Sequence, residues 1–184
     1  MKRIFKRAAF SLVEMLIVIM LFAVLVAISV PLFLPENVKF DSWANSLYNT
    51  LYRGKMAAII NLYEVGFSII DNRNFILFID FNRDGVQSPG DQTIFDSRSI
   101  FSDFRNRNCL IQNVTIVRPN GNVDVINSFN NTLIFRFNTL GFVNLPDNTR
   151  FTSIILNLAN SRVSYRYVIN LTSGGSITIA KQRI

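Results

Sequence analysis

The sequence predicts an α+β protein in which a long, kinked N-terminal helix packs on an antiparallel, all-β domain. An apolar run without a charge extends from Met15 to Leu34, and ~20 such residues cross a hydrocarbon core as a helix. Apolar residues then recur at three-, four- and seven-residue intervals as far as about Tyr63, which is typical of an amphipathic helix. After Val65 the period changes to short β-branched and aromatic runs bounded by turn residues, which indicates strands.

The apolar segment follows the basic stretch MKRIFKR, whose charged residues are Lys2, Arg3, Lys6 and Arg7. This charge predicts a cytoplasmic N-terminus and places the chain after Pro35 on the other side of the membrane. A secretory signal peptide is the competing interpretation, but its apolar core is usually ~7–15 residues long and ends at a small-residue cleavage site. Here the run is longer and ends in VPLFLP, so we expect an uncleaved membrane anchor.

Glu14 lies near the start of this apolar segment, where a charge is costly unless it is paired or reaches water. One interpretation is that Glu14 reaches the cytoplasmic interface. The other uses its neighbours, because a cut after the small residue Ala9 would give Phe10 a new α-amino group. That positive charge, on an adjacent copy or a related subunit, would neutralise Glu14 inside a helical bundle.

The amphipathic segment is predicted to lie on the exported domain through one apolar face. Asp41 and Ser42 are plausible caps for a helix that restarts after Pro35, although continuation through a kink is equally allowed. The face is predicted to contribute core residues and not a ligand site, and it consists of Phe40, Trp43, Leu47, Leu51, Ala58 and Leu62.

The remainder is predicted to be all-β, with hairpin turns at Asn160-Ser161 and Ser173-Gly174-Gly175 joining the last three strands. The expected strands are Gly66–Ile70, Asn74–Ile79, Gln92–Phe95, Leu110–Val117, Thr132–Asn138, Thr152–Asn157, Val163–Asn170 and Ser176–Ala180.

The loop from Asp80 to Asp91 carries Asp80, Asn82, Asp84 and Gly85, with Asp91 in the twelfth position. This order is close to the EF-hand pattern, in which alternating oxygen ligands hold Ca²⁺ and glycine allows the sharp turn. The twelfth residue is Asp and not the longer Glu, and strands flank the loop. Asx and Gly residues also build ordinary hairpin turns, so a structural turn is the favoured interpretation and calcium the alternative. We expect no other cofactor.

Several classes of enzyme site are excluded by composition. The chain has 184 residues, no histidine and a single cysteine, Cys109, so histidine-dependent triads, histidine-ligated zinc and an internal disulfide are all ruled out. A buried, inert thiol is the usual state of such a cysteine, with cross-linking of copies as the alternative. No phosphate-binding GxxxxGK[ST] loop occurs, and we expect no enzymatic activity.

The charge is unevenly distributed along the chain. No acidic residue follows Asp147, so the C-terminal strands are locally basic. Candidate contacts to phosphates there are Arg162, Arg166, Lys181 and Arg183, and a solvated strand face is the plainer interpretation.

The stretch from Ala9 to Pro31 resembles the class III signal of type IV pilins and type II secretion pseudopilins. The matching features are a small residue before Phe10, then Ser11-Leu12-Val13-Glu14, an apolar helix and Pro31. The resemblance implies that prepilin peptidase removes residues 1–9 and methylates the amine of Phe10. It also implies that Glu14 guides docking into a filament and that Pro31 kinks the helix. Ala9 stands where the family has Gly, and processing is still expected because Ala is the nearest residue in size.

Two further segments are similar to the GspH/FimT branch of this family. They are LYRGKMAAI at residues 51–59 and FIDFNRDG followed by PGD between residues 78 and 91. The resemblance implies a leader at 1–9, the transmembrane half of the helix at 10–34, its amphipathic half at 35–63, and a periplasmic β-rich domain at 64–184. It also implies that this antiparallel domain is β-sandwich-like.

The resemblance implies a minor pilin or pseudopilin, a structural subunit that helps initiate or assemble a type IV pilus or a type II secretion pseudopilus. Its partners would be other pilins, prepilin peptidase and the bacterial inner membrane, which the chain would cross once with a periplasmic C-terminal domain. One alternative is a FimT-like subunit that binds DNA during natural transformation, although the C-terminal KQR only loosely replaces that group's GRxR element. A different class is a membrane-tethered binding protein that never polymerises.

Overall fold

The computed structural model describes residues 12–29, 35–82, 84, 87–98 and 108–184. Contacts divide the chain into two units, residues 1–35 and 36–184, and each is described by itself. The predictions that concern Ala9, Phe10 and Pro31 lie outside the described residues. The second unit contains helix α2 and two antiparallel sheets, so the predicted α+β class is confirmed.

Helix α1 spans Leu12–Ser29 and contains Glu14 as its one charged residue. Its side chains are exposed from Leu12 to Ala27. Among the residues that the structure describes, no helix has both the length and the apolar character needed to span a membrane.

Helix α2 spans Glu36–Asn61 and buries one stripe along its length. Trp43 is 2% exposed, and burial of a large apolar side chain contributes about 1.5–3 kcal/mol. The predicted apolar face is confirmed from Phe40 to Ala58. The prediction was wrong for Leu62, which lies beyond the helix end with a φ of 58° and is 69% exposed.

The structure contradicts the expectation that Asp41 and Ser42 cap a helix restarting after Pro35. The helix begins at Glu36, which places Asp41 and Ser42 in its second turn, so neither residue caps it. Residues 30–34 lie outside the described part of the chain, and a single kinked helix through Pro31 therefore stays a prediction.

The strands form two five-stranded sheets. The first has the order β3-β2-β1-β6-β7 and the second the order β10-β9-β8-β4-β5, and every pairing is antiparallel. The strands are β1 Val65–Ile69, β2 Phe75–Ile79, β3 Gln92–Asp96, β4 Cys109–Val117, β5 Val123–Ile126, β6 Thr132–Phe137, β7 Val143–Asn144, β8 Ser153–Asn160, β9 Tyr165–Thr172 and β10 Ile177–Arg183.

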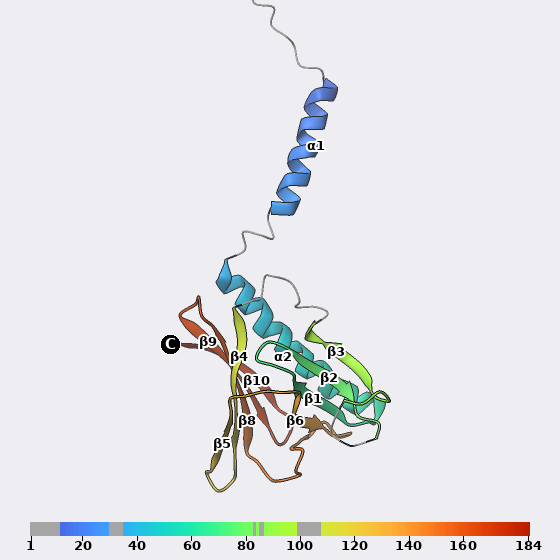
Figure 1. The fold of residues 1–184 in the computed structure, drawn as a ribbon, viewed down its shortest axis with the longest axis vertical. Helices are drawn as coiled ribbons and strands as arrows, with labels where there is room; N and C mark the ends of the chain where they lie inside the picture. The colour runs from blue at the N-terminus through green and yellow to red at the C-terminus, as the bar shows by residue number, and fades with distance from the viewer. Residues whose placement is uncertain (1–11, 30–34, 83, 85–86, 99–107) are drawn as a thin grey trace, which may run out of the picture. The chain divides into compact units, whose positions relative to one another are not determined.

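One hydrophobic core is shared by α2 and both sheets. Figure 1 shows α2 passing alongside both sets of strands, and the helix contacts β1, β2 and β6 of the first sheet and β10 of the second. Among the described residues, the buried members of this core lie between Phe40 and Leu171. Residues 36–184 therefore have a core of their own and can be studied as a separate domain.

The turn between β6 and β7 and the turn between β9 and β10 both contact the C-terminal half of α2. The Lys55 ammonium donates a hydrogen bond of 2.8 Å to the carbonyl of Gly175, and the amide of Val143 donates one of 3.1 Å to the carbonyl of Ser173. Gly141 and Gly175 have φ angles of 79° and 78°. A Cβ on Gly175 would lie 2.0 Å from the carbonyl oxygen of Gly141, so only glycine allows this approach.

We predict that Gly175→Ala destabilises residues 36–184 by about 3 kcal/mol, which urea unfolding will measure. A positive φ costs a residue with a Cβ about 1–2 kcal/mol, and forced overpacking adds about 1–3 kcal/mol. Gly121→Ala is the matched control, because Gly121 has a φ of 84° with nothing within 4 Å of its built Cβ. Equal losses in the two variants would show that the turns do not meet as described.

Candidate functional sites

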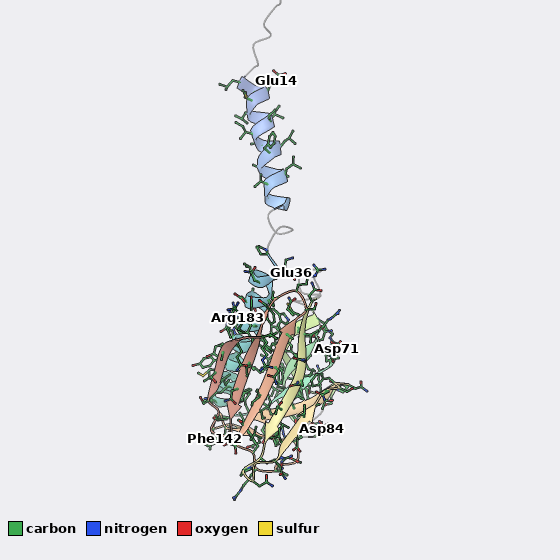
Figure 2. The ribbon with its side chains drawn as sticks, turned by 90° about the vertical axis from the view of Figure 1, so that its left-hand side faces the viewer. Glu14, Glu36, Asp71, Asp84, Phe142 and Arg183 are labelled. Carbon is green, nitrogen blue, oxygen red and sulfur yellow. The ribbon has the colours of Figure 1, made fainter. Side chains whose placement is uncertain are left out.

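The N-terminal motif is described only in part. Glu14 lies in the first turn of α1 and is exposed, whereas Ala9, Phe10 and Pro31 lie outside the described residues. Figure 2 shows Glu14 at the N-terminal end of α1. Its proposed interaction with the amine of a processed Phe10 stays a prediction.

The predicted calcium loop forms the connection between β2 and β3. Three donors converge on Asp91: the amide of Phe81 at 3.0 Å, the amide of Ser88 at 2.7 Å and the hydroxyl of Ser88 at 2.9 Å. The side-chain amide of Asn82 donates to the carboxylate of Asp84 at 2.7 Å. These bonds are the local side-chain contacts that stabilise Asx turns.

Three of the predicted ligands approach one another. Carboxylate oxygens of Asp80, Asp84 and Asp91 lie within 4.8 Å of one another, and Asp80 is only 1% exposed. Oxygen ligands of this kind suit Ca²⁺. Gly85 lies outside the described residues. The hydrogen bonds of Asp91 agree with the structural-turn interpretation, and calcium stays a prediction that experiment must test.

The environment of Asp91 favours its charged form. Burial alone would raise its pKa, but hydrogen bonds from Ser88 and Phe81 outweigh burial and lower the pKa below the ordinary value. A carboxylate with a lowered folded-state pKa stabilises the fold above its unfolded pKa. That contribution is lost as the pH falls through the folded-state pKa.

The four basic candidates for DNA contact do not form one surface. Lys181 pairs with Tyr167, and Arg183 with Tyr165, across β9 and β10, while Gln182 pairs with Arg166. Because paired residues point to the same side of a sheet and neighbours alternate, Lys181 and Arg183 share one face. Arg166 lies on the opposite face, where its Nε donates to Gln182 Oε1 at 3.1 Å.

Arg162 and Lys181 are both engaged with acidic residues of α2. Arg162 Nη1 lies 3.7 Å from Glu36 Oε1, and Lys181 Nζ lies 3.3 Å from each carboxylate oxygen of Asp41. The ammonium of Lys181 also lies 3.7 Å from the centre of the Tyr165 ring. These contacts attach the N-terminal half of α2 to the C-terminal strands.

Asp41 is the residue of this cluster whose role the sequence analysis missed. The hydroxyl of Tyr165 donates to Asp41 Oδ1 at 2.6 Å. Burial alone would raise the pKa of Asp41, but hydrogen bonds from Tyr165, Tyr167 and Lys181 hold the pKa below its ordinary value. Burial and the bond to Asp41 raise the pKa of Tyr167 to about 12. The sequence feature that could have indicated this role is the pair Tyr165 and Tyr167, which occupy alternating positions of a predicted strand.

Cys109 is buried beside Asn160, whose side-chain amide lies 3.5 Å from its sulfur. Burial raises the pKa of the Cys109 thiol to about 11, so the thiol stays protonated near neutral pH and is a poor nucleophile. The environment agrees with the inert interpretation and leaves no access for cross-linking.

The solvent-facing side of α2 is almost free of charge. Its exposed residues include one charged side chain, Arg53, and they are Asn37, Val38, Ser42, Asn45, Asn49, Tyr52, Arg53, Met56, Ile60 and Asn61. Amphipathic helices in soluble domains normally place charged and polar residues on this side. Ile60 is 71% exposed and Tyr52 52% exposed, so apolar area faces outward as well.

The N-terminal residues match a known family model. Residues 4–30 match the model for the prokaryotic N-terminal methylation motif. This stretch carries a type IV pilin-like signal of the kind that prepilin processing requires, and the match includes Ala9, Phe10 and Glu14. Comparisons with curated proteins and with solved structures found no match.

We predict that Asp91→Asn destabilises residues 36–184 by about 1–2 kcal/mol near neutral pH, because the three donors lose a charged acceptor. The loss should shrink when urea unfolding is repeated at about pH 3, where carboxylates become protonated. A loss that does not change with pH would contradict this role of the carboxylate.

Asp84→Asn is the comparison variant, and we expect a smaller loss because its side chain is exposed. The same proteins test calcium. If the loop binds Ca²⁺, millimolar calcium should raise the wild-type unfolding midpoint, and both variants should abolish that rise. An unchanged wild-type midpoint would leave the loop as a hairpin turn.

Proposed function

We propose that this protein is a minor pilin or pseudopilin of the GspH/FimT type that helps initiate or assemble a type IV pilus or a type II secretion pseudopilus. The observation that carries the proposal is the methylation motif at residues 4–30, which includes Glu14. The chain would act as a structural subunit and not as an enzyme. Prepilin peptidase would cut between Ala9 and Phe10, and sibling pilins would be its partners.

The composition of α1 supports an anchoring and assembly role. Its described side chains from Leu12 to Ala27 are exposed, and all are apolar except Glu14. A helix that is hydrophobic all round is stable only where other apolar groups surround it. Inner-membrane lipid before assembly, and neighbouring pilin helices afterwards, would supply such surroundings.

The outer side of α2 supports contact with neighbouring subunits. Tyr52, Met56 and Ile60 recur at a spacing of four residues and are all exposed. Depletion of charge with aromatic and methionine enrichment is the compositional signal of an interface core. In the proposed filament, this side of α2 would face the next subunit.

DNA binding during natural transformation is a second candidate function. The observation that favours it is the pair Lys181 and Arg183 on one face of β10, an edge strand with exposed residues at its end. The carboxylate of Asp41 beside Lys181 opposes it, because a neutralised ammonium releases fewer counterions on binding DNA.

We predict that Glu14→Gln leaves membrane insertion and leader cleavage intact but lowers incorporation into filaments at least about tenfold, since an amide cannot neutralise a buried ammonium. Filaments sheared from cells will be compared with membranes by immunoblotting. Mass spectrometry of the membrane form will report cleavage after Ala9 and methylation of Phe10.

Glu14→Asp is the matched control, because it keeps the charge and should retain part of the incorporation. Normal incorporation of Glu14→Gln would contradict the proposed role of Glu14. A wild-type chain that prepilin peptidase never processes would instead favour a tethered protein that does not polymerise.

For the DNA alternative, we predict that residues 36–184 bind duplex DNA with an affinity that falls steeply as salt rises. Replacement of Lys181 and Arg183 by Ala should reduce the slope of log K against log salt by ~0.9 for each phosphate that the variant no longer neutralises. Arg98→Ala, an exposed arginine paired with Asp96, is the control. Absence of binding at low salt would rule out this function for the domain.

A further inference from the structure

The outward face of the second sheet is broad and almost without charge. Burial alternates along β8, where Ile154, Leu156 and Leu158 are buried and the residues between them are half-buried. The half-buried set therefore points away from the core. Figure 2 shows the strands of this sheet side by side, toward the viewer.

Pairing fixes which residues share this outward face. Ile155 of the central strand pairs with Thr115 and Asn170, Thr115 pairs with Val125, and Asn170 pairs with Thr178. These five residues form one row across all five strands. In the adjacent row, Asn157 lies between Asn113 and Val168.

Arg166 is the one charged residue among the described outward-facing residues of this sheet, and no aromatic residue lies among them. Nucleic acids require several cations or stacking rings, and membrane surfaces require cations with large apolar residues. The face has neither set. Depletion of charge is the signal of a protein–protein interface core, so a protein surface is the occupant that its chemistry fits.

The chemistry of the face is complementary to itself. Asn157 Nδ2 donates to Asn113 Oδ1 at 2.6 Å, which uses part of the capacity of two amides that are both donors and acceptors. The β-branched residues Thr115, Ile155 and Val168 lie beside these amides on the same face and can pack across an interface. Two copies related by a two-fold axis can therefore match amides with amides and apolar groups with apolar groups.

The available area is sufficient for a weak pair. Five strands spaced ~4.8 Å apart, with about seven residues each at ~3.3 Å, give roughly 550 Å². A stable interface takes about 600–1,000 Å² from each partner. We propose that this sheet face is a self-association surface through which two copies of the domain pair sheet to sheet, with affinity at the weak end of specific complexes. The inference does not depend on the proposed filament function.

The test is sedimentation equilibrium of residues 36–184 at concentrations up to about 1 mM, which reaches weak complexes. We expect a monomer–dimer equilibrium that changes little with salt, because the face is nearly uncharged. Ile155→Lys, at the centre of the face, should weaken the dimer at least about tenfold. Val125→Lys, on the 51% exposed edge position, should weaken it also and guards against misfolding of the first variant.

Leu140→Lys is the matched control, because Leu140 lies between β6 and β7 of the first sheet and is 71% exposed, so the same added charge should leave the dimer unchanged. A domain that stays monomeric at about 1 mM would overturn the inference. So would a dimer that Leu140→Lys disrupts and the two sheet variants leave intact. Neither result would bear on filament assembly by the full chain, which depends on Glu14 and α1.

Discussion

The fold of residues 36–184 depends on the contact between the buried stripe of α2 and the inner faces of two separate sheets. Phe40, Trp43, Leu47 and Leu51 belong to the same core as strands from both sheets, and α2 contacts both. A sheet with one apolar face must bury that face against another element. Because α2 contributes to both burials, the helix and the two sheets stabilise one another and are expected to unfold together.

Polar contacts along the margins of α2 determine its position more than they stabilise it. Glu36 contacts Arg162, Asp41 contacts Tyr165 and Lys181, and Lys55 donates to the carbonyl of Gly175. Exposed ion pairs contribute about 0–1 kcal/mol each, far less than the buried stripe. Each contact joins one defined pair of groups, however, and together they hold the two ends of the helix against β9, β10 and the turns on either side of β9.

The sequence was sufficient for the fold class and most strands, because the strands bury one face and show clear β-branched and aromatic runs. It missed β5, with four residues, and β7, with two, since such short segments hardly differ from loops. It ended β10 too early because Lys181 and Arg183 look like a tail, whereas an edge strand tolerates charge. The role of Asp41 depends on Tyr165, which is distant in sequence, so local capping rules could not reveal it.

The distribution of charge on α2 connects its packing to its proposed assembly role. Glu36, Asp41 and Lys55 all interact with the domain, and Arg53 is the one charged residue among the exposed positions of the helix. A helix that needed only to be soluble would gain from the opposite arrangement, because charges on its outer side are hydrated at little cost. In this protein the charges lie at the margins of the helix, and its outer side carries Tyr52, Met56 and Ile60. Covering such a side with another surface has a low desolvation cost. The same side chains that position the helix on its own domain thereby leave its outer side suited to contact with a neighbouring subunit.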